Sequence, residues 1–358
     1  MDCPFRTRRP ECQVNGSGRR RAAGPAYGRH RKAWTRPRTP LLFEPGHAPH
    51  GSSIEESARG SISWEVPRRR SLKTVWTKLK ITLEMIKFEH TVFALPFALI
   101  ATLLAAGGLP GWGQLVWIIL AMVGARSAAM TFNRIVDLRF DAANPRTRTR
   151  ALPAGRLGRG FAVVFTVVMS GLFILSAGML NRLCLVLSVP VLGILFGYSY
   201  TKRFTALSHL ALGFAIGLAP LGAWLAIRGT FDWTPILLGA TVMTWIGGFD
   251  IIYSCQDAAF DREARLFSMP SRWGTRTALQ VSSALHVATV ALLLGVGAGN
   301  GLGVIAYVGI ALVAAILYWE HHIVRPDDLR QVDVAFFNLN GYVSMLLLVA
   351  IATDVLLR

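Results

Sequence analysis

The stretch that decides the fold runs from residue 113 to residue 141 and reads Gly-Gln-Leu-Val-Trp-Ile-Ile-Leu-Ala-Met-Val-Gly-Ala-Arg-Ser-Ala-Ala-Met-Thr-Phe-Asn133-Arg-Ile-Val-Asp137-Leu-Arg-Phe-Asp141. Its apolar part, 113–136, has the length that a helix needs to span a bilayer, about 20 residues. Asn133, Asp137 and Asp141 follow at intervals of four, so a helix places them on one face. Ionised carboxylates beside hydrocarbon cost roughly 2.5–3.5 kcal/mol each at a helix centre. A chain that keeps them there is expected to use them.

A second acidic cluster ends another apolar run, where residues 250–261 read Asp-Ile-Ile-Tyr-Ser-Cys-Gln-Asp-Ala-Ala-Phe-Asp. Asp250, Asp257 and Asp261 fall at i, i+7 and i+11, which again places them on one face of a helix. If folding brings the two faces together, their oxygens form a cage suited to Mg²⁺ and a polyphosphate, because Mg²⁺ prefers oxygen ligands.

The composition is typical of a protein that crosses the membrane several times. Of the 358 residues, 53% are hydrophobic and 16% are charged, and the mean hydropathy is +0.43. The formal net charge of +18 is concentrated near the N-terminus, since residues 1–80 hold 18 Lys and Arg against 6 Asp and Glu. A basic tail ahead of membrane segments favours the lipid bilayer as its partner, and we expect no nucleic-acid partner.

Two regions follow from this pattern. Residues 1–75 are rich in Arg, Pro, Gly and Ser without periodicity, which predicts a disordered basic extension. This extension either lies on anionic lipid or reflects a start codon assigned too far upstream. Residues 76–358 form the predicted transmembrane domain, which begins with an interfacial amphipathic helix from Lys78 to Glu89.

Nine apolar segments of spanning length follow the amphipathic helix. They lie at 90–108, 113–136, 160–179, 182–200, 206–227, 234–254, 276–297, 300–319 and 335–356. Pro and Gly interrupt several of these segments, which is tolerated where the freed backbone groups line a cavity. We therefore predict an all-α, polytopic bundle of nine transmembrane helices around a central chamber.

The basic connections between the predicted segments all fall on one side of the membrane. The connections after segments two, four, six and eight hold most of the Lys and Arg of this region, whereas the odd connections hold only Arg182 and Arg228. Because basic connections face the cytoplasm, both acidic clusters fall at cytoplasmic helix ends. We expect a multi-pass protein of the inner (cytoplasmic) membrane with its active site facing the cytoplasm.

The clusters suit chemistry on a diphosphate ester. A bound Mg²⁺ neutralises the diphosphate and makes it a leaving group, and a carboxylate pair on each of two helices is the sparse ligand set that Mg²⁺ takes in such sites. An apolar bundle would protect an allylic carbocation from water and admit a long isoprenoid tail. Basic side chains near the clusters are suited to phosphate oxygens; they are Arg134, Arg139, Arg146, Arg148, Lys202 and Arg203.

Three stretches resemble the signatures of the UbiA superfamily of intramembrane aromatic prenyltransferases. Residues 133–141, with 144–147 and 152–155, resemble the first signature, and 250–261 resemble the second. The run 198–203, Tyr-Ser-Tyr-Thr-Lys-Arg, resembles the basic segment after helix four. The resemblance covers about 78–358 and is greatest for the 4-hydroxybenzoate polyprenyltransferases and their relatives in menaquinone synthesis.

The resemblance implies a role for each candidate residue. It implies that Asp137, Asp141, Asp257 and Asp261 hold the Mg²⁺ cofactor and are the catalytic residues. Substrate contacts are implied for five further residues: Asn133, Arg139, Arg146 and Lys202 at the polyprenyl diphosphate, and Asp250 near the aromatic acceptor. The implied reaction transfers a polyprenyl group to the ring of 4-hydroxybenzoate or a similar aromatic acid in ubiquinone or menaquinone biosynthesis.

Other functions fit parts of the pattern. A cation-coupled secondary transporter also places acidic residues within its helices, although here the acids lie at one membrane face beside basic loops. A CDP-alcohol phosphotransferase would require an Asp-Gly and Ala-Arg pattern that the sequence lacks. Within the enzyme interpretation the acceptor stays open between 4-hydroxybenzoate, a futalosine-derived acid, homogentisate and a haem-like ring.

Overall fold

The computed structural model describes residues 72–85 and 91–358. The predicted disorder of the N-terminal extension therefore lies almost wholly outside the described residues and stays a prediction. Helix α1 spans Leu72–Met85, so the amphipathic helix begins six residues before the predicted Lys78, and the last part of its predicted range is not described. Ile81 and Met85 of α1 pack against a cluster that includes Leu152 and Leu157.

Long helices account for all nine predicted segments. Eight of the described helices are long and apolar enough to cross a membrane, and the apolar part of α2, Phe93–Ala106, is shorter. No strand occurs within 72–85 or 91–358, so the predicted all-α membrane bundle is confirmed. The long helices are α2 (Thr91–Ala106), α3 (Trp112–Val136), α5 (Arg159–Leu180), α6 (Arg182–Thr201), α7 (Ser208–Arg228), α8 (Trp233–Ser254), α11 (Thr275–Gly299), α12 (Val304–Ile323) and α13 (Asn340–Leu356).

Short elements lie near the predicted sites. They are α4 (Leu138–Ala143), the 3₁₀ turn η2 (Cys255–Asp257), α9 (Ala258–Glu263), α10 (Met269–Trp273) and the π-helical turn η3 (Val334–Leu339). The predicted segment 300–319 is displaced by four residues, since α12 begins at Val304. Gly301 has a φ of +57°, a left-handed conformation that ends one helix before the next begins.

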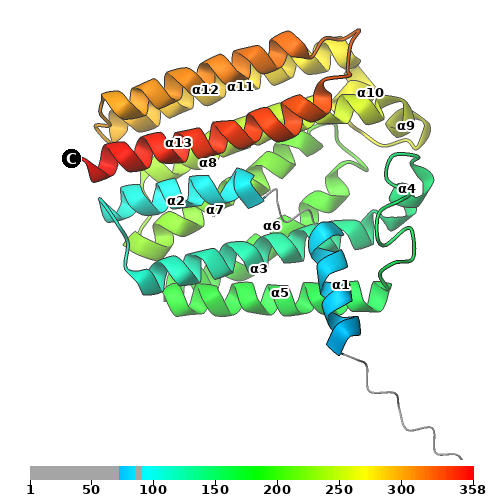
Figure 1. Ribbon diagram of the computed structural model, residues 1–358, viewed down its shortest axis with the longest axis horizontal. Helices are drawn as coiled ribbons and strands as arrows, with labels where there is room; N and C mark the ends of the chain where they lie inside the picture. The colour runs from blue at the N-terminus through cyan, green and yellow to red at the C-terminus, as the bar shows by residue number, and fades with distance from the viewer. Residues whose placement is uncertain (1–71, 86–90) are drawn as a thin grey trace, which may run out of the picture. The chain divides into compact units, whose positions relative to one another are not determined.

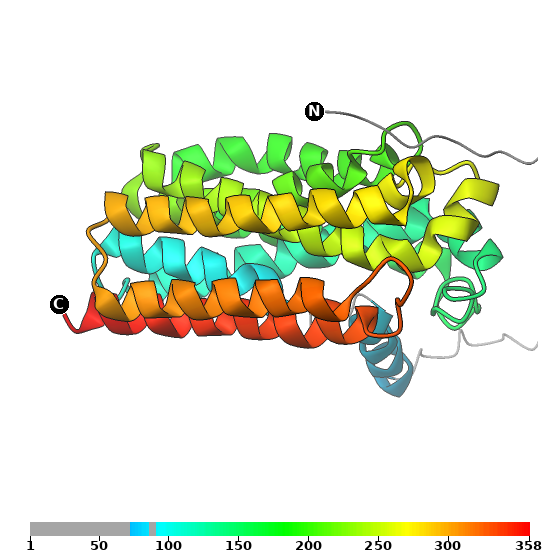
Figure 2. The ribbon, with the colours of Figure 1, turned by 90° about the horizontal axis from the view of Figure 1, so that it is seen from above.

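The long helices pack side by side as a bundle (Figures 1 and 2). Their side chains line two cavities that share several lining residues. On one side α3 packs against α5, and α5 against α6; on the other, α8 packs against α11, and α12 against α13. Helix α7 joins the two sides through contacts with α2, α6 and α8. This arrangement confirms the predicted bundle around a chamber.

Glycines allow a close backbone contact between α7 and α8. A Cβ atom on Gly217 would lie 2.5 Å from the Gly239 carbonyl oxygen, and one on Gly213 would lie 2.3 Å from that of Met243. Small residues four apart let membrane helices approach at backbone distance. This contact places residues of α7 and α8 next to each other in the wall of the polar cavity described below.

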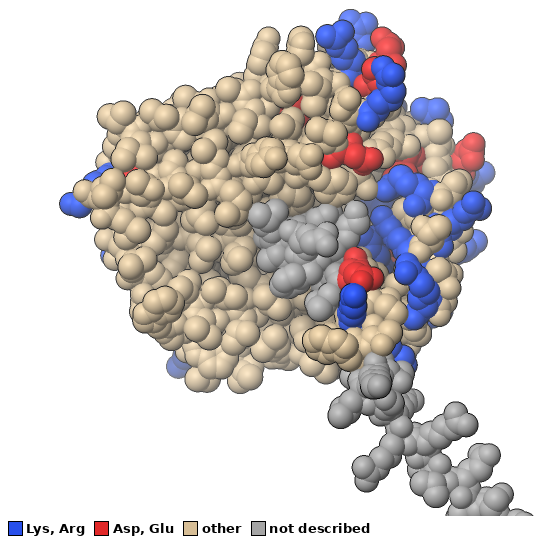
Figure 3. All heavy atoms as spheres, viewed as in Figure 1, with Lys and Arg blue, Asp and Glu red and all other residues tan. Residues whose placement is uncertain are grey.

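Charged residues gather at one end of the bundle. In Figure 3 most visible Lys and Arg side chains lie at the end where Figure 1 places α4, α9 and α10, and few appear elsewhere on this face. The apolar faces between the ends carry exposed large side chains such as Val164 and Val168 on α5. This distribution is that of an integral membrane protein.

Candidate active site

A polar cavity of about 310 Å³ lies at the charged end of the bundle and is lined from α2, α3, α4, α6, α7, α8, α9 and η3. Both acidic clusters line it. Eight of the nine candidate site residues line the cavity: Asn133, Asp137, Asp141, Arg146, Lys202, Asp250, Asp257 and Asp261.

Arg139 is the candidate that the cavity does not include. Its side chain is exposed on α4, and it does not line the cavity that holds Asp137 and Asp141. Two positions after Asp137 on a helical path, Arg139 points away from the face that Asp137 and Asp141 share. Arg150, which does line the cavity, contacts the first cluster instead: Arg150 Nη1 donates to Asp141 Oδ1 at 2.7 Å.

The first cluster keeps its shared face although the helix does not run through it. Helix α3 ends at Val136 and α4 begins at Leu138. The hydrogen bonds from Asp137 N to Asn133 O, 2.9 Å, and from Asp141 N to Asp137 O, 2.8 Å, continue the helical pattern across the break. The three side chains therefore still line one wall.

Each carboxylate of this cluster has one satisfied oxygen and one unsatisfied oxygen. Lys202 Nζ donates to Asp137 Oδ2 at 2.6 Å, and Asn133 Nδ2 donates to the same oxygen at 3.2 Å. Asp137 Oδ1 and Asp141 Oδ2 are buried and accept no hydrogen bond among the described residues; the nearest cations are Arg203 Nη2, 3.9 Å from the first, and Arg134 Nη1, 3.8 Å from the second. Buried carboxylate oxygens that accept no hydrogen bond are costly, so this pair is suited to receive a closer cation.

The second cluster is joined to the first half of the chain by the loop after α4. Arg146 Nε donates to Asp257 Oδ1 at 2.9 Å, its Nη2 pairs with Asp257 Oδ2, and Asn144 Nδ2 donates to Asp257 Oδ1 at 3.1 Å. Arg146 Nη1 also donates to the Tyr253 hydroxyl at 2.7 Å. Burial alone lowers the pKa of Arg146, but these interactions with Asp257 and Tyr253 raise the pKa more, and the net pKa lies above its ordinary value.

The remaining acids of the second cluster have different surroundings. Asp261 lies on α9 and is half-buried at the cavity wall. Asp250 lies on α8, and His209 of α7 contacts it, with His209 Nδ1 2.6 Å from Asp250 Oδ2. The sequence interpretation did not single out His209, because only the packing of α7 on α8 brings it to Asp250.

The described residues contain no preformed group of three His, Cys, Asp or Glu side chains close enough to hold a metal ion. Their carboxylates are paired with Lys and Arg instead. The donor set nevertheless fits Mg²⁺, since Asp137 Oδ1 and Asp141 Oδ2 are buried oxygens that accept no hydrogen bond among the described residues and Mg²⁺ is usually held by one or two carboxylates with phosphate oxygens and water.

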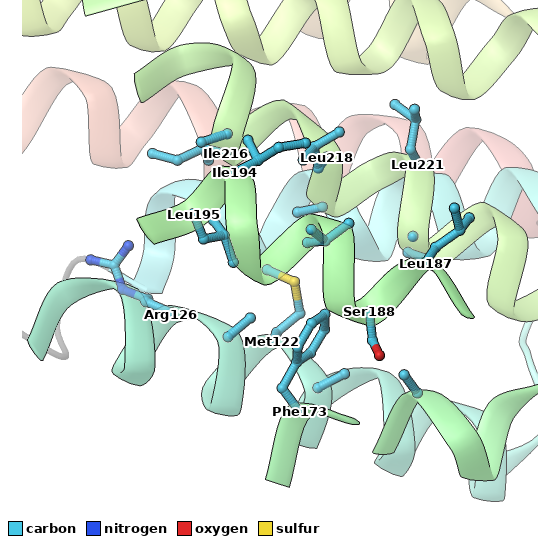
Figure 4. Close-up of a pocket in the computed structure, with 18 of the residues that line it drawn as sticks. Met122, Arg126, Phe173, Leu187, Ser188, Ile194, Leu195, Ile216, Leu218 and Leu221 are labelled. Atoms are coloured by element: carbon cyan, nitrogen blue, oxygen red, sulfur yellow. The ribbon is translucent and has the colours of Figure 1, made fainter. Parts of the chain in front are cut away.

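A second, apolar cavity of about 340 Å³ adjoins the polar one (Figure 4). It is lined mainly by aliphatic side chains of α3, α5, α6 and α7. Arg126 of α3, at one end of the cavity in Figure 4, lines both cavities, as Tyr198 of α6 also does. A charged cavity and a hydrocarbon-lined cavity thus meet at these shared residues.

The family model described as the UbiA prenyltransferase family matches residues 94–342. The chain belongs to this family. The prediction of a UbiA-type aromatic prenyltransferase is confirmed by this match and by the curated relatives of this UbiA protein. A 4-hydroxybenzoate octaprenyltransferase of Vibrio cholerae is 31% identical over 261 residues, which cover 71% of this chain and 89% of that protein. One of Nitrosospira multiformis is 28% identical over 255 residues, covering 71% and 87%.

Solved structures share the fold of this UbiA protein. The apo structure of a UbiA homologue from Aeropyrum pernix K1 is 36% identical, with a TM-score of 0.69, and the match covers 75% of this chain and 98% of that chain. A UbiA homologue from Archaeoglobus fulgidus bound to DMAPP and Mg²⁺ is 18% identical, with a TM-score of 0.56 over 74% of this chain and 98% of that chain. At that identity the second likeness shows the fold alone.

Proposed function

We propose that this UbiA protein transfers a polyprenyl group from polyprenyl diphosphate to the ring of 4-hydroxybenzoate or a similar aromatic acid, with Mg²⁺ as cofactor. The observation that carries the proposal is the junction of a cavity lined by paired acids and cations with a cavity lined by hydrocarbon. Such a junction matches a substrate with a diphosphate head and an isoprenoid tail. The names of the Vibrio and Nitrosospira relatives support the same reaction.

The cations and carboxylates of the polar cavity would hold the diphosphate. Arg146 and Lys202 already lie against carboxylates, and both line the cavity. Asp137 and Asp141, with Asp257 and Asp261 opposite, would hold Mg²⁺, which when bound neutralises the diphosphate oxygens and favours departure of pyrophosphate. A homologue from Archaeoglobus fulgidus was solved with DMAPP and Mg²⁺, which supports this assignment.

Before the substrate binds, Lys202 and Arg146 also position the carboxylates of the site. Their contacts hold the Asp137 and Asp257 side chains at the cavity wall. When the diphosphate enters, its oxygens compete for the same cations, so the carboxylates become available to a metal as the phosphate binds. The site therefore exchanges ion pairs within the protein for ion pairs with the substrate.

Arg126 supports an acidic acceptor. Its Nε atom is buried without a hydrogen-bond partner, and no acidic side chain of the described residues forms an ion pair with it. A buried donor without a hydrogen-bond partner is costly, and a guanidinium is suited to a carboxylate, which it binds through two parallel hydrogen bonds. Arg126 lines the cavity junction together with Tyr198, so we assign it to the carboxylate of the aromatic acid.

An aromatic wall completes the acceptor side. Phe93, Phe249 and Phe336 line the polar cavity, and the Phe336 ring centroid lies 5.1 Å from that of Phe249 and 6.0 Å from that of Phe93. Their faces suit a flat aromatic acceptor and, through their electron-rich surfaces, the cationic allylic group. The wall excludes water from the reacting carbon.

The reaction follows from these positions. The C–O bond of the diphosphate ester breaks and its electron pair leaves with pyrophosphate. The ring carbon ortho to the hydroxyl forms a new C–C bond to the allylic carbon, and the ring then loses the proton from that carbon. The product would serve ubiquinone or menaquinone synthesis. We place the protein in the inner membrane with the polar cavity facing the cytoplasm, because the basic loops gather at that end.

Mass spectrometry tests the proposal. Membranes that contain the protein, given a polyprenyl diphosphate, Mg²⁺ and a panel of aromatic acids, should form a prenylated acid. Asp137→Asn and Asp257→Asn should each abolish product formation, because both remove a charge from the Mg²⁺ and diphosphate site. Full activity of either variant would refute the assignment, and counterflow of substrate without chemical change would favour the transporter.

A further inference from the structure

His209 and Asp250 meet at the wall of the polar cavity, one from α7 and one from α8. His209 Nδ1 lies 2.6 Å from Asp250 Oδ2. The imidazole is 5% exposed, whereas the carboxylate is 24% exposed. The histidine is therefore enclosed by protein, while part of the aspartate remains open to the cavity.

The surroundings of His209 determine which ring nitrogen carries the proton. The backbone N–H of Met269 donates to His209 Nε2 at 3.3 Å. A backbone N–H can only donate, so Nε2 presents its lone pair and the proton of the neutral ring is on Nδ1. Nδ1–H consequently donates to Asp250 Oδ2. The network thus holds a neutral imidazole against a carboxylate that accepts.

Asp250 differs in its partners from three of the four proposed Mg²⁺ ligands. Asp137, Asp141 and Asp257 each pair with a Lys or Arg side chain. Asp250 forms no ion pair with Lys or Arg among the described residues, and its Oδ1 has no hydrogen-bond partner there. Asp261 likewise forms no ion pair with Lys or Arg there, but it lies on α9 close to Asp257, among the proposed Mg²⁺ ligands. Asp250 is thus the acid outside that ligand set whose free oxygen can receive a proton.

The backbone contact between α7 and α8 fixes the pair. His209, Gly213 and Gly217 fall at i, i+4 and i+8 and share one face of α7. The two glycines lie against the α8 backbone at Met243 and Gly239. Because no side chain intervenes, the distance from His209 to Asp250 is set by rigid helices, which hold functional groups more accurately than loops do.

We propose that His209 is a positioning residue that orients Asp250 to accept the phenolic proton of the aromatic acceptor. This inference rests on the proposed function. The imidazole occupies Asp250 Oδ2 and leaves Oδ1 for the acceptor hydroxyl. Asp250 is the proton acceptor, and His209 acts only through it.

The proton transfer balances as follows. As the ortho carbon bonds to the allylic carbon, the O–H bond breaks, its proton moves to Asp250, and pyrophosphate leaves with the electron pair of the broken C–O bond. The product at this point is a neutral cyclohexadienone. The C–H proton of the substituted carbon then passes to pyrophosphate, and Asp250 returns its proton to the oxygen. The aromatic ring and the carboxylate are both restored.

Steady-state kinetics of four variants test the inference in membranes or detergent with the full chain. Asp250→Asn should lower kcat by about 10²-fold or more, the usual contribution of a general base. His209→Leu should lower kcat on the order of 10-fold, since it removes only the orienting donor, and KM for the polyprenyl diphosphate should not change. His209→Asn should recover most of the loss, because its amide N–H can occupy the place of Nδ1–H. His322→Leu, a change at an exposed histidine, is the matched control and should behave as wild type.

A double variant separates positioning from a structural role. His209→Leu combined with Asp250→Asn should be no slower than Asp250→Asn alone, because residues that act as a unit are not additive. Multiplied losses would show that His209 acts independently of Asp250 and would overturn the inference. So would unchanged kcat in His209→Leu, or a loss in His209→Asn as large as in His209→Leu when both variants melt at the wild-type temperature.

Nitrogen NMR of ¹⁵N-histidine protein gives a readout that does not require turnover. The chain has 8 histidines, and the signal lost in His209→Asn identifies His209. We expect the tautomer with Nδ1 protonated, and a shift of that signal in Asp250→Asn. The opposite tautomer would overturn the inference even in an active enzyme. A wild type that prenylates no aromatic acid would instead refute the proposed function, while the NMR result would still report on the pair.

Discussion

At the scale of single residues, Arg146 connects the two acidic clusters. It lies in the loop after the first cluster, yet it holds Asp257 of the second through two nitrogens and Tyr253 through a third. Arg146→Lys keeps the charge but loses the planar fork. We expect kcat/KM for the diphosphate substrate to fall by a factor of about 10 or more, as for one or two lost charged hydrogen bonds of roughly 1.5–3 kcal/mol.

The exposed Arg139 provides the matched control for Arg146. Arg139→Lys changes the same chemistry at a position outside the cavity, so kcat/KM should stay near the wild-type value. Equal losses in the two lysine variants would contradict the assignment of Arg146 to the diphosphate.

Arg126 gives a second prediction at this scale, on acceptor specificity. Arg126→Leu should raise KM for 4-hydroxybenzoate by about 10- to 100-fold, since a buried charged hydrogen bond is lost, and should leave KM for the polyprenyl diphosphate unchanged. The test acceptor is a phenol without a carboxyl group. Its turnover should not fall in Arg126→Leu, whereas a parallel loss with both acceptors would show that Arg126 does not read the carboxylate.

At the scale of elements, the contact of α7 with α8 determines whether the cavity wall forms. Gly217→Ala would place a Cβ 2.5 Å from the Gly239 carbonyl oxygen, so the helices must separate. We expect a lower melting temperature in detergent, by overpacking of about 1–3 kcal/mol, together with a lower kcat as His209 moves from Asp250.

Gly222 is the matched control on the same helix. A Cβ atom there meets nothing within 4 Å, and alanine is the better helix former by about 1 kcal/mol. Gly222→Ala should therefore melt at the wild-type temperature or above it. If Gly217→Ala melts as Gly222→Ala does, α7 and α8 do not depend on this close approach.

At the scale of the whole molecule, the sequence predicted where the helices lie along the chain but not which side chains meet when the helices pack. Length and hydropathy predicted the nine segments because a bilayer imposes both. The spacing of Asp137 and Asp141 predicted their shared wall. The contact of Asn144 with Asp257, 113 residues apart, and that of His209 with Asp250 depend on helix packing, which a linear pattern does not record.

The differences between prediction and structure also have physical causes. Arg139 was selected for its charge near Asp137, and its spacing of two places it on the other side of a helical path, outside the cavity. The π-helical turn at Val334–Leu339 carries Phe336 into the cavity, and no periodic signal distinguishes such a turn from an α-helix. Asn340 follows this turn. It accepts a hydrogen bond from Trp245 Nε1 at 2.7 Å and donates one to Glu320 Oε1 at 2.8 Å. This buried network stabilises the end of the π-helical turn, which the sequence pattern did not predict.

The apolar cavity makes a prediction for the molecule as a whole, because its length should limit the isoprenoid. Ala121 lines it on α3, five residues before Arg126 at the junction, which is about 7.5 Å along a helix. Ala121→Phe should fill the cavity beyond the first isoprene units. Transfer from geranyl diphosphate should then stay near wild type, and transfer from octaprenyl diphosphate should fall, measured by competition between the two donors. Val168→Phe, on the exposed face of α5, should leave the ratio unchanged. An unaltered ratio in Ala121→Phe would mean that the tail takes another path, directly between helices into the lipid.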